Sequence, residues 1–451
     1  MASRHNKLGL RHLSWPIGIE LLLQFLMGTV DTLMVSRIGD NAVSAVGVSN
    51  QVLQTAMTLF TVINAGAGAI LARMWGARNW EATRRTAAIA IQINVAFGLA
   101  GGLFFLFASG QVLRMMQVPG DVFEYAHSYL SIVGGGMMIV TLHLVVNALI
   151  RNTGNTKGPM VITIGMNVLH LLLNYVLIFG VGLFPAMGVE GSAISTVVSR
   201  AAALALSIVL LWRSFEPRMT RQDWFSWDRS LLKDIVGIGL PVSVTAMSWG
   251  FSQIVLLSVI ASLGANALAS YTYIQTIQQF PWMIAAAVGS ALSIQIGQWY
   301  GASQHQLVYR GPLRAISAGL ILIATAAVLI WIGGEPIMSM FTSNADIIAL
   351  SLPLLGLCII WQTLRVIPFC LSNALNIVGS ARPVAILSVI GMWLVSTGGA
   401  YWFGAVLGWG LPGVLLAMML DEVLRGSFFV YQWFRRQRRL VGSLEQALSA
   451  K

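Results

Sequence analysis

Residues 16–42 read PIGIELLLQFLMGTVDTLMVSRIGDNA, and they have a counterpart 225 residues later at 241–267, PVSVTAMSWGFSQIVLLSVIASLGANA. Both stretches begin with proline, continue through a long apolar segment and end in a Gly-x-Asn-Ala motif. A helix needs about 20 mostly apolar residues to cross the hydrocarbon core of a membrane. The pair therefore predicts membrane-spanning helices and an internal repeat of the chain.

Later loops align at the same offset, which pairs Gly76 with Gly301, Arg85 with Arg310 and Gly154 with Gly379. A copy with an even number of spans returns to the side on which it began, so both copies have the same orientation. We therefore expect an all-α polytopic membrane protein with two six-helix lobes, related by a parallel pseudo-two-fold repeat. The expected boundaries are 1–215 for the first lobe, 216–234 for a cytoplasmic linker, and 235–451 for the second lobe with a basic C-terminal tail.

The composition supports this class, because 57% of the residues are hydrophobic, only 10% are charged and the mean hydropathy is +0.76. A soluble domain carries about 25% charged residues. Apolar segments recur along nearly the whole chain, and the twelve expected spans are 10–36, 44–73, 86–110, 123–150, 159–183, 189–213, 235–262, 266–297, 313–333, 346–378, 384–407 and 412–434.

The net charge of +11 could suggest nucleic acid as a partner, but the position of the basic residues indicates otherwise. Of the 27 Lys and Arg residues, 22 fall at the termini and in the loops of one side, whereas the other side has only Arg37 and Arg114. The remaining three lie inside spans. Basic residues mark the cytoplasmic side. We therefore expect an inner-membrane protein with both termini in the cytoplasm and no nucleic-acid partner.

Three polar side chains lie inside the first span, at Glu20, Gln24 and Asp31. At about 100° per residue they fall on one face of an otherwise apolar helix. Ionisable residues inside a membrane are costly, so each needs a structural or functional reason. One interpretation is a pair of carboxylates that neighbouring hydroxyls and amides satisfy. The other is a buried carboxylate that exchanges protons during transport.

Further polar residues fall inside other spans. Asn167, His170 and Asn174 share one face of the span at 159–183 and are possible partners of the first span, although a lone histidine is more often a hydrogen-bonded core residue. We assign candidate cavity residues in the first lobe at Asn64, Asn147 and Thr196, and in the second lobe at Trp249, Gln253, Tyr271, Gln275, Gln278 and Arg365. Arg365 is expected to pair with an acid or to face the cavity, and the pairing among Asp421, Glu422, Arg425 and Arg365 is left open.

Several motifs occur in order along this frame: VDTLM at 30–34, GDNAVSAVG at 39–47, NYVLIFG at 174–180, GVEGSAIST at 188–196 and QWYGA at 298–302. Together they resemble the multidrug and toxic compound extrusion (MATE) family over residues 10–435. The resemblance implies export of organic cations and other lipophilic drugs in exchange for inward H⁺ or Na⁺, by alternating access.

The resemblance also implies that Asp31 is the coupling acid and that His170 and Asn174 match an Asn-x-x-x-Asp/Asn motif near it. This chain departs from the motif, with histidine at the first position and the amide variant at the second. Some sodium-coupled members carry acids where this chain has Trp249 and Arg365, which favours H⁺ over Na⁺ here. A sodium site beside Asp31 stays open, because amide and carboxylate oxygens can bind that ion.

Two other classes of function are open to a polytopic membrane protein. A flippase for a lipid-linked sugar is the alternative, but such a protein would be expected to line its cavity with several basic residues. A membrane enzyme is disfavoured, because the sequence offers no nucleophile–base pair and no metal-ligand spacing. We therefore expect a monomeric transporter of small molecules in the lipid bilayer, with no cofactor and no structural metal.

Overall fold

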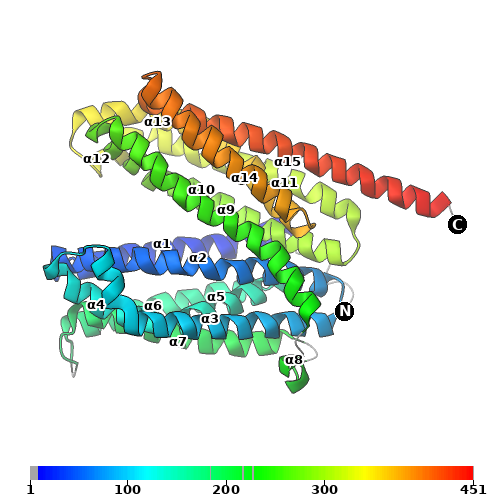
Figure 1. Ribbon diagram of the computed structural model, residues 1–451, viewed down its shortest axis with the longest axis horizontal. Coiled ribbons are helices and arrows are strands. Elements are labelled where there is room, and N and C mark those ends of the chain that lie inside the picture. Colours follow the sequence, from blue (N-terminus) through cyan, green and yellow to red (C-terminus); the bar gives the residue numbers. More distant parts are fainter. Residues whose placement is uncertain (1–8, 183, 216–217, 226–227, 450–451) are drawn as a thin grey trace. The chain divides into compact units, whose positions relative to one another are not determined.

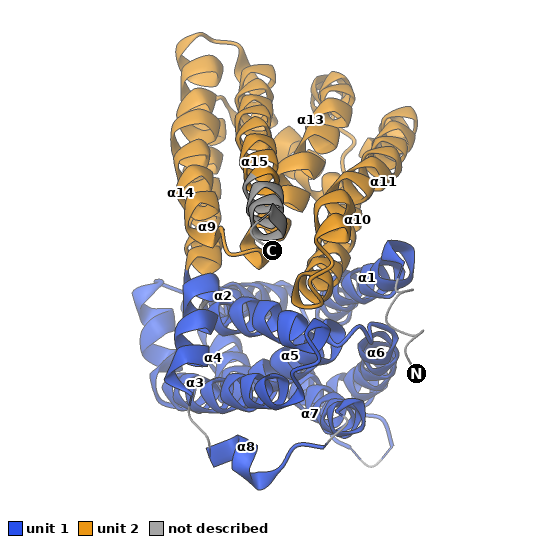
Figure 2. Cartoon of the chain, turned by 90° about the vertical axis from the view of Figure 1, so that its right-hand side faces the viewer, with its two compact units in different colours: residues 1–240 blue, residues 241–451 orange. Residues whose placement is uncertain are grey.

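The computed structural model describes residues 9–182, 184–215, 218–225 and 228–449, and this part of the chain is helical throughout, without strands (Figure 1). The chain divides into two compact units, residues 1–240 and 241–451 (Figure 2). The helices of the first unit are α1 (Leu10–Val35), α2 (Asp40–Gly76), α3 (Trp80–Met115), α4 (Gly120–Gly135), α5 (Met137–Asn152), α6 (Lys157–Phe179), α7 (Gly188–Ser214) and the short α8 (Arg221–Phe225).

Helix α9 (Arg229–Ser262) begins in the first unit and continues into the second. The second unit also contains two π-helical segments, η1 and η2, which continue directly from α14. Its further elements are α10 (Ala265–Gly301), α11 (His305–Ile332), α12 (Gly334–Ser339), α13 (Ala345–Ile377), α14 (Ala381–Ile390), η1 (Gly391–Thr397), η2 (Ala400–Val406) and α15 (Gly410–Ser449).

Each of the twelve predicted spans coincides with a helix or a bent helical pair. Among the described residues, nine helices are long and apolar enough to cross a membrane. Two more spans are bent pairs, with an angle of 44° within α2 and of 48° between α4 and α5. The last predicted span lies within α15, which carries the charged residues Asp421, Glu422 and Arg425. These charges lower its apolarity, but they belong to the site described below.

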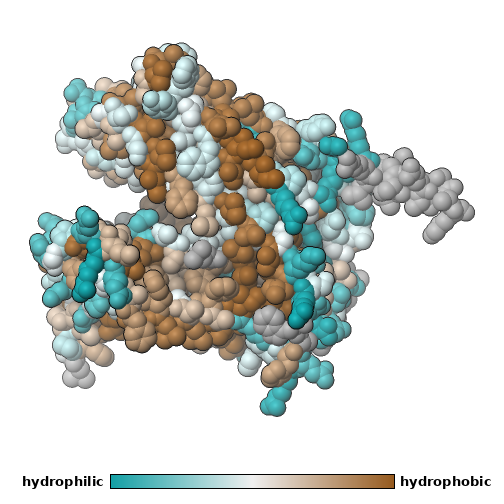
Figure 3. Space-filling model, in the orientation of Figure 1, coloured by the Kyte–Doolittle hydropathy of each residue, from teal (hydrophilic) through white to brown (hydrophobic). Residues whose placement is uncertain are grey.

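Large apolar side chains cover much of the outer surface of the helices, as the brown areas of Figure 3 show. On α3 the exposed residues include Phe97, Leu103, Phe104 and Phe107, the last with 80% of its surface exposed. Water-soluble proteins rarely expose contiguous apolar patches of this kind. The surface is suited to lipid, in agreement with the composition.

Helices α6 and α7 approach each other closely at Gly191. A Cβ atom at this position would lie 2.6 Å from the carbonyl oxygen of Leu177. We expect Gly191→Ala to lower the free energy of unfolding by about 1–3 kcal/mol, because the backbone of α6 would have to move. The matched control is Gly165→Ala on α6, where no atom lies within 4 Å of the new methyl group. Thermal unfolding of both variants in detergent tests this, and equal midpoints would contradict it.

The short helix α8 is attached to α3 through Asp223. Its carboxylate accepts hydrogen bonds from the backbone N–H and the hydroxyl of Thr220, at 2.7 and 2.9 Å, and from Arg84 Nε at 3.0 Å. The side-chain amide of Gln92 also donates to the carbonyl of Trp224. Burial alone would raise the pKa of Asp223, but the hydrogen bonds from Thr220 and Arg84 hold it below its ordinary value.

The lowered pKa of Asp223 means that the charged form stabilises the attachment. This contribution is present above the unfolded-state pKa of about 4 and is lost as pH falls through the folded-state pKa. We expect Asp223→Asn to speed amide hydrogen exchange in residues 218–225 about tenfold at pH 7, since a charged hydrogen bond contributes about 1.5–3 kcal/mol. The difference from wild type should shrink at pH 3. Equal exchange at pH 7 would contradict the assignment.

Candidate functional site

Asp31 is the buried acid of α1, with 8% of its surface exposed. The side-chain N–H of Asn174 on α6 donates a hydrogen bond of 2.5 Å to its Oδ1 atom. The oxygen of the same amide accepts a hydrogen bond from the hydroxyl of Ser195 on α7. Three helices are thus joined by one chain of polar groups inside the first unit.

His170 adds a second contact to the same carboxylate. Its Nδ1 atom lies 3.5 Å from Asp31 Oδ1, and its Nε2 atom lies 3.2 Å from the hydroxyl of Thr196 on α7. The spacing of four residues puts His170 and Asn174 on one face of α6, so both reach Asp31. The side chains of Asp31, His170, Asn174, Ser195 and Thr196 are all buried. We therefore treat Asp31, Asn174, His170, Ser195 and Thr196 as one site and call it the Asp31 cluster.

Two residues near this cluster were not assigned to the site from the sequence. Arg200 on α7 and the buried Tyr129 on α4 both interact electrostatically with Asp31. A signal for Arg200 existed, since it is one of only three basic residues inside the predicted spans. Ser195 had no such signal, because small hydroxyl residues are frequent in these helices. The guanidinium of Arg200 offsets the charge of the carboxylate.

The other two polar residues of α1 do not join the Asp31 cluster. Glu20 is buried and pairs with Arg151 on α5, with Nη1 and Oε1 2.6 Å apart. Gln24 is exposed. The three residues therefore share one face of α1 but have different surroundings: Glu20 is in an ion pair, Gln24 is exposed and Asp31 is in the Asp31 cluster.

Two further first-unit candidates lie in other polar contacts. The side-chain N–H of Asn147 donates a 3.1 Å hydrogen bond to His143 Nε2, and the side-chain oxygen of Asn147 accepts a 2.9 Å hydrogen bond from Ser207. Asn64 on α2 has a buried side-chain oxygen without a hydrogen-bond partner among the described residues. These residues are therefore polar groups of the unit interior, separate in their contacts from Asp31.

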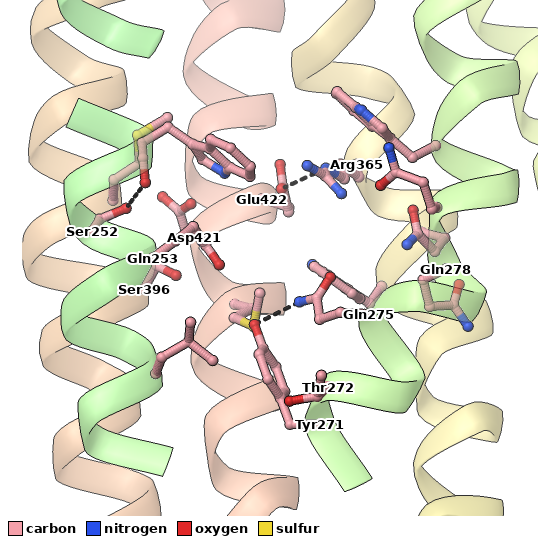
Figure 4. Close-up of a pocket in the computed structure, with 18 of the residues that line it drawn as sticks. Ser252, Gln253, Tyr271, Thr272, Gln275, Gln278, Arg365, Ser396, Asp421 and Glu422 are labelled. Atoms are coloured by element: carbon pink, nitrogen blue, oxygen red, sulfur yellow. Dashed lines mark hydrogen bonds and ion pairs between the residues drawn. The ribbon is translucent and has the colours of Figure 1, made fainter. Parts of the chain in front are cut away.

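The second unit contains a pocket of about 610 Å³ (Figure 4). It is lined by all six second-lobe residues proposed from the sequence: Trp249, Gln253, Tyr271, Gln275, Gln278 and Arg365. Residues of α10 line it because spacings of three and four place them on one face. On that face, Gln275 donates a 2.5 Å hydrogen bond to the hydroxyl of Tyr271. The π-helical segment η1 adds Met392 and Ser396.

The pocket is also lined by the four charged residues whose pairing the sequence left open. Arg425 contacts both acids of α15, at 2.7 Å to Asp421 and 3.0 Å to Glu422. Arg365 on α13 lies 3.8 Å from Glu422 (Figure 4). Gly391 lets η1 approach this network, since a Cβ atom there would lie 2.3 Å from Asp421 Oδ1. We call Arg365, Asp421, Glu422 and Arg425 the α15 charge network.

Among the described residues, no group of three or more His, Cys, Asp or Glu side chains is placed to hold a metal ion.

Comparison with known proteins gives the family. The model of the MatE family matches residues 16–176 and matches again at residues 241–402. The chain belongs to the MATE family of transporters. The two matches start 225 residues apart, which is the offset of the internal repeat. The resemblance predicted from the sequence is confirmed, and so is the prediction that the protein is a transporter and not an enzyme.

Similar proteins cover nearly the whole chain. The "Uncharacterized transporter YisQ" of Bacillus subtilis is 33% identical over 94% of this chain and 93% of its own length. The "Probable multidrug resistance protein NorM" of Thermotoga maritima is 24% identical over 94% of this chain and 92% of its own. The crystal structure of a MATE protein in the bent conformation superposes with a TM-score of 0.88, at 23% identity and 96% coverage of both chains. The predicted fold class, twelve helices in two lobes, is confirmed.

Proposed function

We propose that this MATE protein is an antiporter that exports organic cations and lipophilic drugs in exchange for H⁺, by alternating access. The observation that carries the proposal is the contact of the buried Asp31 carboxylate with Asn174 and His170 on α6. A carboxylate inside a membrane protein is costly and marks an ion pathway in many transporters. Its proton can be taken up on one side of the membrane and released on the other.

The substrate class rests on the relatives. The Thermotoga maritima relative has multidrug resistance in its name, and the Staphylococcus aureus relative MepA is named a multidrug export protein. The exported compounds are therefore small organic molecules, and a cation is attracted to the charged form of Asp31.

Proton coupling is favoured over sodium coupling by the orientation of the Asn174 amide. Its NH₂ group faces the carboxylate, while its oxygen faces Ser195. A sodium ion beside Asp31 would need oxygen ligands, and the nearby guanidinium of Arg200 would repel it. A proton needs neither additional oxygen ligands nor a cavity.

We further propose that the protein acts as a monomer in the inner membrane with both termini in the cytoplasm. The distribution of basic residues supports this orientation. The lobe boundaries at 1–215 and 235–451 also stay predictions.

The function is tested in proteoliposomes that contain the purified protein and a fluorescent cation such as ethidium. An H⁺ gradient and a Na⁺ gradient are imposed separately, with the membrane potential clamped. We expect ethidium movement with the H⁺ gradient alone. Ethidium movement with the Na⁺ gradient alone would show that Na⁺, and not H⁺, is the coupling ion. No ethidium movement with either gradient would reject the antiport of organic cations.

A further inference from the structure

Three buried side chains in the lining of the second-unit pocket carry polar atoms that no described group satisfies, three of these atoms being donors and one an acceptor. Trp361, Gln278 and Gln362 each have only 2% of their surface exposed. The indole N–H of Trp361, the amide nitrogen of Gln362 and both amide atoms of Gln278 lack a hydrogen-bond partner in the part of the chain that the structure describes. A buried polar group left unpaired costs about 1–3 kcal/mol. Three of these four atoms are N–H donors, so a ligand that reached them from the pocket would have to supply acceptors.

Arg365 is the least satisfied charge of the α15 charge network. Its guanidinium lies over the ring of Trp282, at 3.9 Å from the centroid, and 5.5 Å from that of Trp361. Its only ion-pair contact among the described residues is Glu422 at 3.8 Å, which exceeds hydrogen-bond distance. A guanidinium has five N–H donors. Most of the donor capacity of Arg365 is therefore free for a ligand in the pocket.

The two acids of the network are engaged elsewhere. Asp421 and Glu422 both contact Arg425 closely, at 2.7 and 3.0 Å. A cationic ligand would have to displace this guanidinium and would be repelled by Arg365. An anionic ligand instead meets one available guanidinium and several unpaired N–H groups.

We propose that this pocket binds organic anions, namely carboxylates attached to a planar aromatic ring. A carboxylate can accept two parallel hydrogen bonds from Arg365 and a further one from the indole N–H of Trp361. The exposed indole of Trp249 and the side chain of Leu257 in the lining give the aromatic ring an apolar surface. The volume of about 610 Å³ is within the usual range of small-molecule sites, about 300–1,000 Å³. This site does not depend on Asp31, so it extends the proposed function to a second substrate class.

The test uses two probes with the same ring and opposite charge, 1-naphthoate and 1-naphthylmethylammonium. Binding to the full-length protein in phosphatidylcholine nanodiscs is measured by isothermal titration calorimetry, and the lipid contributes no anionic head group that could compete. We expect the wild-type protein to bind naphthoate at least about tenfold more tightly than the ammonium probe. Tighter binding of the ammonium probe would overturn the proposal.

Variants locate the site. Arg365→Gln should weaken naphthoate binding about tenfold or more, as expected for loss of a charge-assisted bidentate contact. The same change at the exposed Arg310, Arg310→Gln, should have no effect. Glu422→Gln should tighten binding, because it frees Arg365 from its only acidic contact among the described residues. Unchanged naphthoate binding in Arg365→Gln would reject the site.

Two further variants keep the result interpretable. If Arg365→Gln does not fold, Trp361→Phe removes the unpaired indole N–H while leaving the charges intact, and it should weaken naphthoate binding while the protein still folds. Asp31→Asn should leave naphthoate binding unchanged even though cation antiport is lost. If Asp31→Asn lost both naphthoate binding and cation antiport, the anion site would not be independent of Asp31. Loss of cation antiport alone agrees with an independent anion site.

Discussion

The Asp31→Asn protein is expected to reach the membrane at the wild-type level but to lose gradient-driven efflux down to the rate of protein-free vesicles. Asparagine has nearly the same shape as aspartic acid, so the contacts with Asn174 and His170 can largely persist. It cannot take up or release a proton, however, and the cycle then has no coupled step. Efflux of ethidium from proteoliposomes under an imposed H⁺ gradient measures this directly.

The matched control is Asp121→Asn, which makes the same change at an exposed residue in the first turn of α4. It should transport at the wild-type rate. Glu20→Gln should reduce transport less than Asp31→Asn, because Glu20 pairs with Arg151 outside the Asp31 cluster. If Asp31→Asn exports ethidium like wild type, Asp31 is only a structural hydrogen-bonding residue.

The Arg425→Met protein is expected to be the least stable of the variants considered. The change leaves Asp421 and Glu422, two adjacent buried acids, without their close cationic partner. Removing one partner of a buried ion pair costs about 3–5 kcal/mol. We therefore expect a clear fall in the thermal unfolding midpoint in detergent, together with reduced yield of folded protein.

Arg382→Met serves as the control, because Arg382 is exposed near the start of α14. Its unfolding midpoint should stay close to that of wild type. Replacing Asp421 by Asn in the Arg425→Met background should recover part of the lost stability, since one uncompensated acid is removed. A midpoint for Arg425→Met equal to that of Arg382→Met would show that the network contributes little to folding.

The helices and the repeat could be predicted because lipid imposes a simple requirement on sequence. Each span must be long and apolar, and the loops between the spans retain glycines at a constant offset, such as Gly154 and Gly379. The last predicted span, 412–434, lies within α15 although Asp421, Glu422 and Arg425 reduce its apolarity. These charges are explained by pairing within the second unit.

The sequence predicts which site residues share a face of one helix, but not which residues of other helices they contact. Spacing correctly places His170 and Asn174 on one face of α6, and both contact Asp31. The same argument put Glu20 and Gln24 on the face of α1 that carries Asp31, but periodicity does not define which residue of another helix each of them meets. Glu20 meets Arg151, and Gln24 is exposed. Partners across helices depend on rotation and packing, which a single sequence does not specify.

The coupling role of Asp31 is tested most directly by measuring the change in internal pH that substrate transport causes. Proteoliposomes are loaded with a pH-sensitive dye, and ethidium is added outside without any imposed ion gradient. We predict that ethidium entry through the wild-type protein drives H⁺ out of the vesicles, so that the internal pH rises. The Asp31→Asn protein should give no change in internal pH. Ethidium transport without any pH change in the wild type, or an equal pH change in Asp31→Asn, would contradict the account.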